Sequence, residues 1–149
     1  MKTILIVDAN VIDNRLCEVL DSQGYQSLLA RDARTALLIL GRGTPVDLVV
    51  AETELPDMDG MDFLLHLQRT YRAIPVVIVT VTCSVERYLQ AVNLGVVEYL
   101  TKPLYMKEFS RIVRLALNQT ASNCPRPGTG QILAGTPGED GREFPGKSR

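Results

Sequence analysis

Three runs of apolar residues lack the alternation of polar and apolar positions that marks a half-exposed strand. They cover residues 4–7 (ILIV), 48–51 (LVVA) and 75–81 (PVVIVTV), and they are rich in Val and Ile. Continuous runs of this length and composition are typical of parallel strands that are buried on both faces. We therefore predict three central strands, and we predict further strands at two less apolar segments, 25–30 and 96–100.

Segments whose apolar residues recur at helical spacing lie between and after these strands. The predicted helices are residues 11–22, 33–40, 61–69, 85–94 and 105–118. Asp32 and Ser84 stand directly before two of them, where their side chains can accept hydrogen bonds from the first backbone N–H groups. Gly24 and Gly95 follow the ends of two helices. Strands that alternate with helices in this way predict a parallel α/β sheet with helices on both faces.

Composition and charge are those of an ordinary globular protein, and the charge argues against some classes of partner. Of the 149 residues, 46% are hydrophobic and 22% are charged, and the formal net charge is -1. This charge creates no strongly positive field, so neither nucleic acid nor an anionic membrane is expected as a partner. The N-terminal apolar run is short and is broken by Asp8, unlike a signal peptide or a membrane span. Three cysteines at unrelated spacings fit neither a disulfide framework nor a zinc site, and we expect a cytoplasmic protein.

The chain is expected to form one domain, residues 1–119, followed by a tail. Residues 120–149 are dense in Gly and Pro and contain few large apolar side chains. Such a segment cannot bury enough apolar surface to fold on its own, so we predict a disordered tail. Ile132, Leu133 and Phe144 leave open a short docking motif within it.

Polar side chains stand where the predicted strands end. Asp8 ends the first strand, Glu52 the third and Thr80 the fourth, while Lys102 follows the fifth. Because ligands of open parallel sheets bind outside the carboxyl ends of the strands, these side chains are expected to converge. Two carboxylates, a hydroxyl and an ammonium suit a phosphoryl group, since carboxylates hold Mg²⁺ and the other two groups bind phosphoryl oxygens. The alternative is that Asp8 and Glu52 are merely the polar ends of buried strands.

Four segments stand in a fixed order along the chain: ILIVDAN, DLVVAETELPDMDG, PVVIVT and GVVEYLTKP. Together they resemble the receiver domain of response regulators, the CheY-like family, over about residues 2–119. The resemblance implies a flavodoxin-like, doubly wound α/β fold with five parallel strands in the order 2-1-3-4-5 and helices on both faces. It also implies that a histidine kinase transfers a phosphoryl group to an aspartate at the end of the third strand.

The resemblance places Glu52 at the phosphoacceptor position, where the family has an aspartate. It places the family's acidic pair on Asp8 and Ala9, so one direct metal ligand is missing. The third metal ligand that it implies is the backbone carbonyl of Glu54. A full site with three aspartates and one lysine carries a charge of about -2, whereas Asp8, Glu52 and Lys102 sum to about -1. Mg²⁺ binding is therefore expected to be weak or absent.

Other family positions are kept. By resemblance, Thr80 is the switch hydroxyl, Lys102 binds the phosphoryl group and Tyr99 is the switch aromatic residue. The step from Lys102 to Pro103 resembles the family's Lys-Pro step, at which a cis peptide bond is usual. Alternatively, Thr80 and Tyr99 are ordinary residues of strand ends.

The extra methylene of Glu52 changes what its carboxylate can do. It displaces the oxygens by roughly 1.5 Å relative to an aspartate. Because misplacement on the order of 1 Å can slow a reaction about a hundredfold, phosphoryl transfer to Glu52 is not expected, and neither is any catalytic residue. The longer side chain can instead reach Lys102 and form a charge-assisted hydrogen bond in place of a metal. Two states stay open: an active-like receiver with Thr80 and Tyr99 drawn inward, or a scaffold that does not switch.

These features predict a stand-alone, atypical receiver that is not an enzyme and that signals by binding proteins. Its expected binding surface comprises the helix over 85–94, the strand over 96–100 and the helix over 105–118, with Tyr88, Tyr99 and Tyr105 as aromatic anchors. A histidine kinase and a second copy of the chain stay open as partners. The alternative function is a working phosphoacceptor that a histidine kinase phosphorylates with Mg²⁺. An FMN or nucleotide binder is a third candidate, but the segment after the first strand lacks the small residues of a phosphate cradle.

Other reactive residue types have ordinary structural interpretations. Asp57 and Asp59 are expected to shape the turn before the helix over 61–69. His66, the single histidine, is expected to be a surface residue or a packing residue of a helix rather than a catalyst. Cys83 is expected to be an inert thiol, with a redox role as the alternative.

Overall fold

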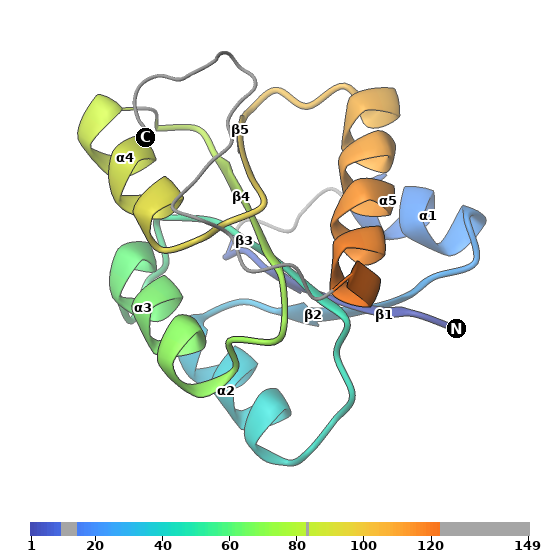
Figure 1. Ribbon diagram of the computed structural model, residues 1–149, viewed down its shortest axis with the longest axis horizontal. Coiled ribbons are helices and arrows are strands. Elements are labelled where there is room, and N and C mark those ends of the chain that lie inside the picture. The colour runs from blue at the N-terminus through green and yellow to red at the C-terminus, as the bar shows by residue number, and fades with distance from the viewer. Residues whose placement is uncertain (10–14, 83, 123–149) are drawn as a thin grey trace.

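The computed structural model describes residues 1–9, 15–82 and 84–122, with side chains up to residue 118. Its strands are β1 (Thr3–Val7), β2 (Gln26–Ala30), β3 (Leu48–Ala51), β4 (Val76–Thr80) and β5 (Glu98–Thr101). Its helices are α1 (Arg15–Ser22), α2 (Ala33–Gly41), α3 (Gly60–Thr70), α4 (Val85–Asn93) and α5 (Met106–Ser122) (Figure 1). The start of the predicted first helix, Cys83 and the predicted tail beyond residue 122 lie outside the described residues.

The strands form one parallel sheet in the order β2-β1-β3-β4-β5, which confirms the flavodoxin-like, doubly wound fold. Strands β1, β3 and β4 are buried along their whole length, because helices cover both faces of the sheet. The edge strands β2 and β5 include exposed residues. The strand order reverses at β1, which lies between β2 and β3. Residues that follow β1 and β3 therefore flank the crevice where ligands of such sheets bind.

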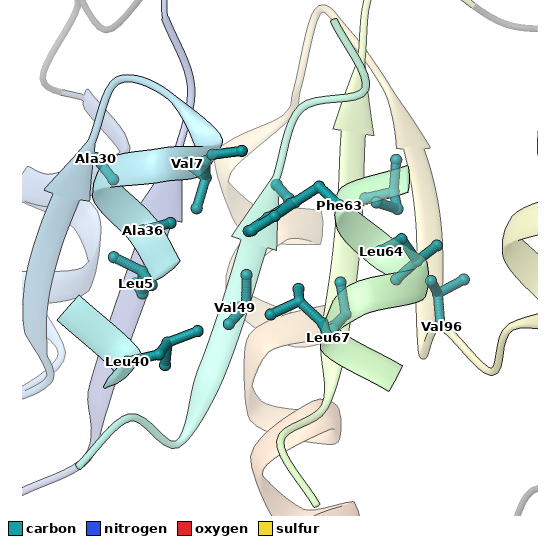
Figure 2. Packing of buried hydrophobic residues seen from close by; sticks show 14 of the residues in the cluster. Leu5, Val7, Ala30, Ala36, Leu40, Val49, Phe63, Leu64, Leu67 and Val96 are labelled. Atoms are coloured by element: carbon teal, nitrogen blue, oxygen red, sulfur yellow. The ribbon is translucent and has the colours of Figure 1, made fainter. Parts of the chain in front are cut away.

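Successive residues of each strand point to opposite faces, so the sheet has a hydrophobic layer on each side. On one face, α2, α3 and α4 pack against the sheet, and Phe63, Leu64 and Leu67 of α3 are buried there (Figure 2). On the other face, α1 and α5 lie side by side, and Phe109 and Val113 of α5 are buried (Figure 1). Among the described residues, no helix is long and apolar enough to cross a membrane.

The four residues predicted to begin or end helices have the expected hydrogen bonds or backbone angles. Asp32 and Ser84 each accept a hydrogen bond from the backbone N–H three residues further on, at 2.8 and 3.1 Å. Gly24 and Gly95 have φ angles of 86° and 85°, the left-handed conformation that favours Gly after a helix. These caps are therefore confirmed.

Two predicted boundaries are wrong. Helix α5 extends to Ser122 instead of ending at residue 118, because the first helix-breaking residue after it is Pro125. Strand β5 begins at Glu98 instead of residue 96. The N–H of Val96 donates to the carbonyl of Ala91 at 3.2 Å, so Val96 completes the end of α4.

The loop between β3 and α3 folds back tightly on the end of β3. At the start of α3, Gly60 N donates to Thr53 O at 2.8 Å. A Cβ atom at residue 60 would overlap the backbone of Thr53, so this approach requires glycine. Asp59 caps α3 by accepting a hydrogen bond from Met61 N at 2.7 Å. This packing fixes the position of Thr53 and, with it, that of the adjacent Glu52.

Replacing Gly60 by Ala should destabilise the protein by about 1–3 kcal/mol, because the added methyl group forces the backbone of Thr53 to move. Urea unfolding measures this change in the free energy of unfolding. Gly41→Ala is the matched control, because a Cβ at residue 41 has nothing within 4 Å. That variant should lose less than about 1 kcal/mol or gain stability. Equal stability of Gly60→Ala and wild type would contradict the tight packing of this loop.

Candidate functional site

The carboxyl ends of β1, β3 and β5 bring Asp8, Glu52 and Lys102 together at one edge of the sheet. Each of the three donates its backbone N–H to a carbonyl of the neighbouring strand, at 2.9, 2.9 and 2.8 Å. Sheet hydrogen bonding therefore continues past the strand ends and aligns these residues with one another. The peptide bond between Lys102 and Pro103 is cis, as the resemblance implies.

The Lys102 ammonium group bridges the two carboxylates. Its Nζ lies 2.8 Å from Asp8 Oδ2 and 3.3 Å from Glu52 Oε1. The side chain of Glu52 is only 5% exposed, so its charge requires a partner inside the protein. Burial acts to lower the pKa of Lys102, but the hydrogen bond and charge of Asp8 and the charge of Glu52 raise the pKa overall. Lys102 is therefore a stable cation that balances part of the buried negative charge.

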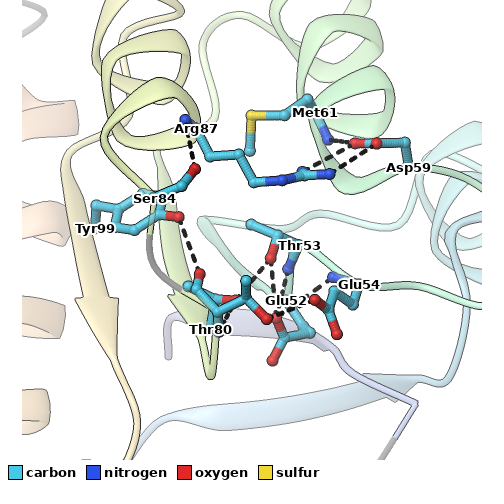
Figure 3. Close-up of polar contacts among 10 residues, drawn as sticks. Glu52, Thr53, Glu54, Asp59, Met61, Thr80, Ser84, Arg87 and Tyr99 are labelled. Carbon is cyan, nitrogen blue, oxygen red and sulfur yellow. Dashed lines mark hydrogen bonds and ion pairs between the residues drawn. The ribbon is translucent and has the colours of Figure 1, made fainter.

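The second oxygen of Glu52 is held by the residues that follow it. Oε2 accepts hydrogen bonds from Thr53 N at 2.8 Å and Thr53 Oγ1 at 3.2 Å, with a longer contact to Glu54 N at 3.4 Å (Figure 3). Both carboxylate oxygens thus have positively polarised partners. Hydrogen bonds to an ionised acceptor are stronger than those between neutral groups, so this side chain is fixed in one orientation.

The hydroxyl of Thr80 bonds to the hydroxyl of Thr53 at 2.7 Å. A carboxylate can only accept, so Thr53 Oγ1 gives its single proton to Glu52, and Thr80 Oγ1 must then donate to Thr53. Thr80 Oγ1 in turn accepts from Thr82 N at 3.1 Å. A directed series of hydrogen bonds therefore runs from the loop after β4 to Glu52, through the two buried threonines (Figure 3).

Thr53 is a site residue that the sequence reasoning missed. Its hydroxyl lies between the predicted switch residue Thr80 and the predicted phosphoacceptor position, Glu52. A hydroxyl directly after a strand-end carboxylate was the available signal. The direction of this side chain depends on the close contact of Gly60 with the Thr53 backbone, which the sequence pattern does not reveal.

Glu54 and Tyr99 both contact Thr82, in the loop between β4 and α4. Thr82 Oγ1 donates to Glu54 Oε2 at 2.5 Å, and the Tyr99 hydroxyl donates to Thr82 O at 3.4 Å. The Tyr99 ring meets the ring of Tyr88 edge to face, with centroids 5.5 Å apart. The structure therefore places Tyr99 against α4, and it gives Glu54 a side-chain contact in addition to its predicted backbone role.

The acidic residues of the PDMDG turn act at two different helices. Asp59 caps α3, as expected of a residue that shapes the preceding turn. Asp57 instead accepts hydrogen bonds from Ala33 N at 3.0 Å and Arg34 N at 2.9 Å, at the start of α2. A carboxylate is favourable there, because the N-terminus of a helix carries partial positive charge. The sequence interpretation of Asp57 as a local turn residue was therefore incomplete.

The donor set at this edge does not suit Mg²⁺, which requires a near-octahedral shell of oxygen ligands. In the part of the chain that the structure describes, no group of three or more His, Cys, Asp or Glu side chains is placed to hold a metal. Asp8 and Glu52 supply two carboxylates, and the Lys102 ammonium already lies between them. Two negative charges and one positive charge leave the trio at -1. The carbonyl of Glu54 as a further ligand stays a prediction.

Replacing Lys102 by Met should destabilise the protein at neutral pH by about 1–4 kcal/mol, because two buried carboxylates lose their shared cation. The pKa of Lys102 is raised above 10.5, so its contribution is fully present below that pH and is lost as pH rises through the folded pKa. The stability difference between wild type and Lys102→Met should therefore be constant near neutral pH and shrink above about pH 10.5. Urea unfolding at a series of pH values measures it.

Lys107→Met is the matched control for this substitution, since Lys107 is exposed on α5. It should change the free energy of unfolding by less than about 0.5 kcal/mol at any of these pH values. An equal effect of the two substitutions, or a Lys102→Met difference that persists unchanged at high pH, would contradict the bridging role of the ammonium group.

Sequence comparison identifies relatives of this chain. The family model described as response regulator receiver domain matches residues 4–114. Response regulator MprA of Mycolicibacterium vanbaalenii is 28% identical over 136 residues, which are 91% of this chain and 57% of that protein. Transcriptional regulatory protein ZraR of Escherichia coli is 33% identical over 120 residues, 80% of this chain and 27% of that protein. The chain thus spans 57% of the length of MprA and 27% of the length of ZraR.

Solved structures have the same fold. A receiver domain protein (CheY-like) from Methanospirillum hungatei superposes with a TM-score of 0.77 at 24% identity, over 83% of this chain and 99% of that one. The signal receiver domain of an HD domain-containing protein from Pseudomonas fluorescens has a TM-score of 0.76 at 33% identity, over 81% and 98%. The family match over residues 4–114 and the shared fold show that the chain belongs to the response regulator receiver domains of two-component signalling.

Proposed function

We propose that this receiver domain signals without being phosphorylated and acts by binding a protein partner. The observation that carries the proposal is the Lys102 bridge, in which one ammonium group pairs with both Asp8 and Glu52. In the family that the chain resembles, the residues at these three positions bind the metal or the phosphoryl group. Here the ammonium group of Lys102 offsets one of the two negative charges.

The hydrogen bonding of Glu52 makes it a poor nucleophile in this proposal. Hydrogen-bond donors and a cation stabilise the negative charge of a carboxylate and so weaken it as a nucleophile: Oε1 pairs with Lys102, and Oε2 accepts from Thr53 and contacts Glu54 N. The Thr80 hydroxyl is likewise engaged with Thr53. Phosphorylation would require several of these charge-assisted bonds to break, and a longer side chain than the family's aspartate to find the correct geometry. We therefore favour the scaffold that does not switch over the active-like state.

A working phosphoacceptor is the second candidate function. It is favoured by Lys102 and Thr80, which the resemblance assigns to phosphoryl binding and which both lie at the carboxyl edge of the sheet. In that case a histidine kinase would be the donor, as in the family. Covalent phosphate on the protein distinguishes the two candidates.

The partner surface in this proposal is the face formed by α4, β5 and α5. Helix α4 exposes Val85, Leu89 and Val92, with Val85 73% exposed, and Tyr105 is exposed just before α5. Val85, Leu89 and Val92 follow one another at helical spacing and form an apolar stripe along α4. Such a stripe suits an apolar helix of a different protein, so we propose that kind of partner; a second copy of this chain is the alternative occupant.

Intact mass after incubation with acetyl phosphate and Mg²⁺ tests the proposal. Wild type should gain no phosphoryl adduct, because Glu52 is misplaced and both its oxygens are engaged. The variant Glu52→Asp with Ala9→Asp should gain one, because it restores the nucleophile and the acidic pair that the resemblance implies. Glu52→Asp alone should gain less, since the metal ligand is still missing.

Glu54→Asp is the matched control, because it makes the same change two residues away and should leave the protein unmodified. An adduct on wild type would make the phosphoacceptor the correct function. If the double variant stays unmodified, residues 9 and 52 do not by themselves explain why the protein is not phosphorylated.

A further inference from the structure

The loop between β3 and α3 contains carboxylates that bind different neighbours. Glu52 binds Lys102 at the sheet edge, and Asp57 binds the start of α2. The other two, Glu54 and Asp59, face the loop between β4 and α4 and the first turns of α4. Only these two act on the helix that belongs to the proposed partner surface.

Thr82 is the contact point of Glu54. It is an exposed residue, yet all three of its polar groups bond to the protein: N to Thr80, Oγ1 to Glu54 and O to Tyr99. These partners come from β4, the loop after β3 and β5. An exposed loop residue ordinarily bonds to water, so three protein partners indicate a loop that is held in place.

Arg87 is the contact point of Asp59. Its NH1 and NH2 lie 3.3 and 3.1 Å from the two oxygens of Asp59, a bidentate pair (Figure 3). The hydrogen bond from Arg87, followed by that from Met61 N, lowers the pKa of Asp59 below its ordinary value, which favours the ionised form that pairs with Arg87. Bidentate pairs of this kind fix orientation as well as distance.

Helix α4 buries little of its own apolar surface. Ala91 is its single buried residue, and the apolar stripe of Val85, Leu89 and Val92 faces outward. A helix of nine residues is marginal by itself, so its position depends on its contacts with the rest of the protein. The contacts from Glu54 and Asp59 therefore act together with the buried Ala91 and with the contact between the Tyr88 and Tyr99 rings in positioning α4.

We propose that Glu54 and Asp59 act as a polar clamp, defined by the Glu54–Thr82 and Asp59–Arg87 contacts, that holds α4 in one position whether or not a phosphoryl donor is present. The inference rests on the proposed function, since it explains how the partner surface is fixed in a receiver that does not switch. The Asp59–Arg87 pair joins the loop after β3 directly to α4. The Glu54–Thr82 contact acts on the loop before α4, and Thr82 N also bonds to Thr80. The clamp presents the apolar stripe of α4 to the partner in a constant orientation.

Hydrogen exchange of the α4 amides, followed by mass spectrometry without any phosphoryl donor, tests the clamp. Thr82→Val and Arg87→Met should each raise exchange in α4 about threefold, and the double variant about tenfold, while α5 exchanges at the wild-type rate. About 1 M NaCl should raise α4 exchange in wild type but not in Arg87→Met, because the ion pair is partly exposed and is screened by salt.

Gln90→Met is the matched control, because it places the same side chain at an exposed position of the same helix and should leave exchange unchanged. Wild-type exchange of α4 in the double variant would overturn the clamp, and so would an equal increase in α4 and α5. Because no phosphoryl donor is used, these results stand apart from the mass measurement. If hydrogen exchange overturns the clamp while wild type gains no phosphoryl adduct, the proposed function still stands.

Discussion

The structure depends on one ammonium group that lies between two carboxylates at the carboxyl edge of the sheet. A parallel sheet with three fully buried strands brings the strand ends close together, and Asp8 and Glu52 would repel one another there. Lys102 removes that conflict at distances of 2.8 and 3.3 Å. Part of the positive charge that a metal would otherwise supply therefore comes from the chain itself.

The other carboxylates of the loop between β3 and α3 also bind groups of the protein itself. Glu54, Asp57 and Asp59 each bind a different neighbouring segment, and Gly60 lets the loop return to the end of β3. The result is a site whose polar groups bond to one another and leave little for an external ligand to organise. In the function proposed above, such a site serves to present a constant surface rather than to report a chemical modification.

Much of this arrangement follows from sequence, and the remainder has identifiable reasons. Continuous apolar runs identified the buried strands, and the rule for strand ends identified Asp8, Glu52 and Lys102. The reach of Glu52 toward Lys102 followed from its extra methylene and is confirmed at 3.3 Å. These inferences succeeded because they depend on topology, which the alternation of strands and helices determines.

Contacts between loops were harder to predict. Thr53 received no role because its direction depends on the fold of the loop that follows it. Asp57 caps a helix 24 residues earlier in the chain, and Arg87 pairs with Asp59 across 28 residues. Neither distance leaves a periodic pattern in the sequence, since such pairs arise only when the packed elements bring two loops together.

The most direct test of the central claim is a titration of the protein with Mg²⁺, followed by the backbone amide resonances of Glu52, Thr53 and Lys102. If the ammonium group already balances the two carboxylates, these resonances in wild type should not show a saturable shift at millimolar Mg²⁺. The variant Glu52→Asp with Ala9→Asp should show a saturable shift, because it adds a carboxylate ligand at residue 9 and shortens the side chain at residue 52. A saturable shift in wild type that matches the variant would contradict the account, since the metal would then bind despite Lys102.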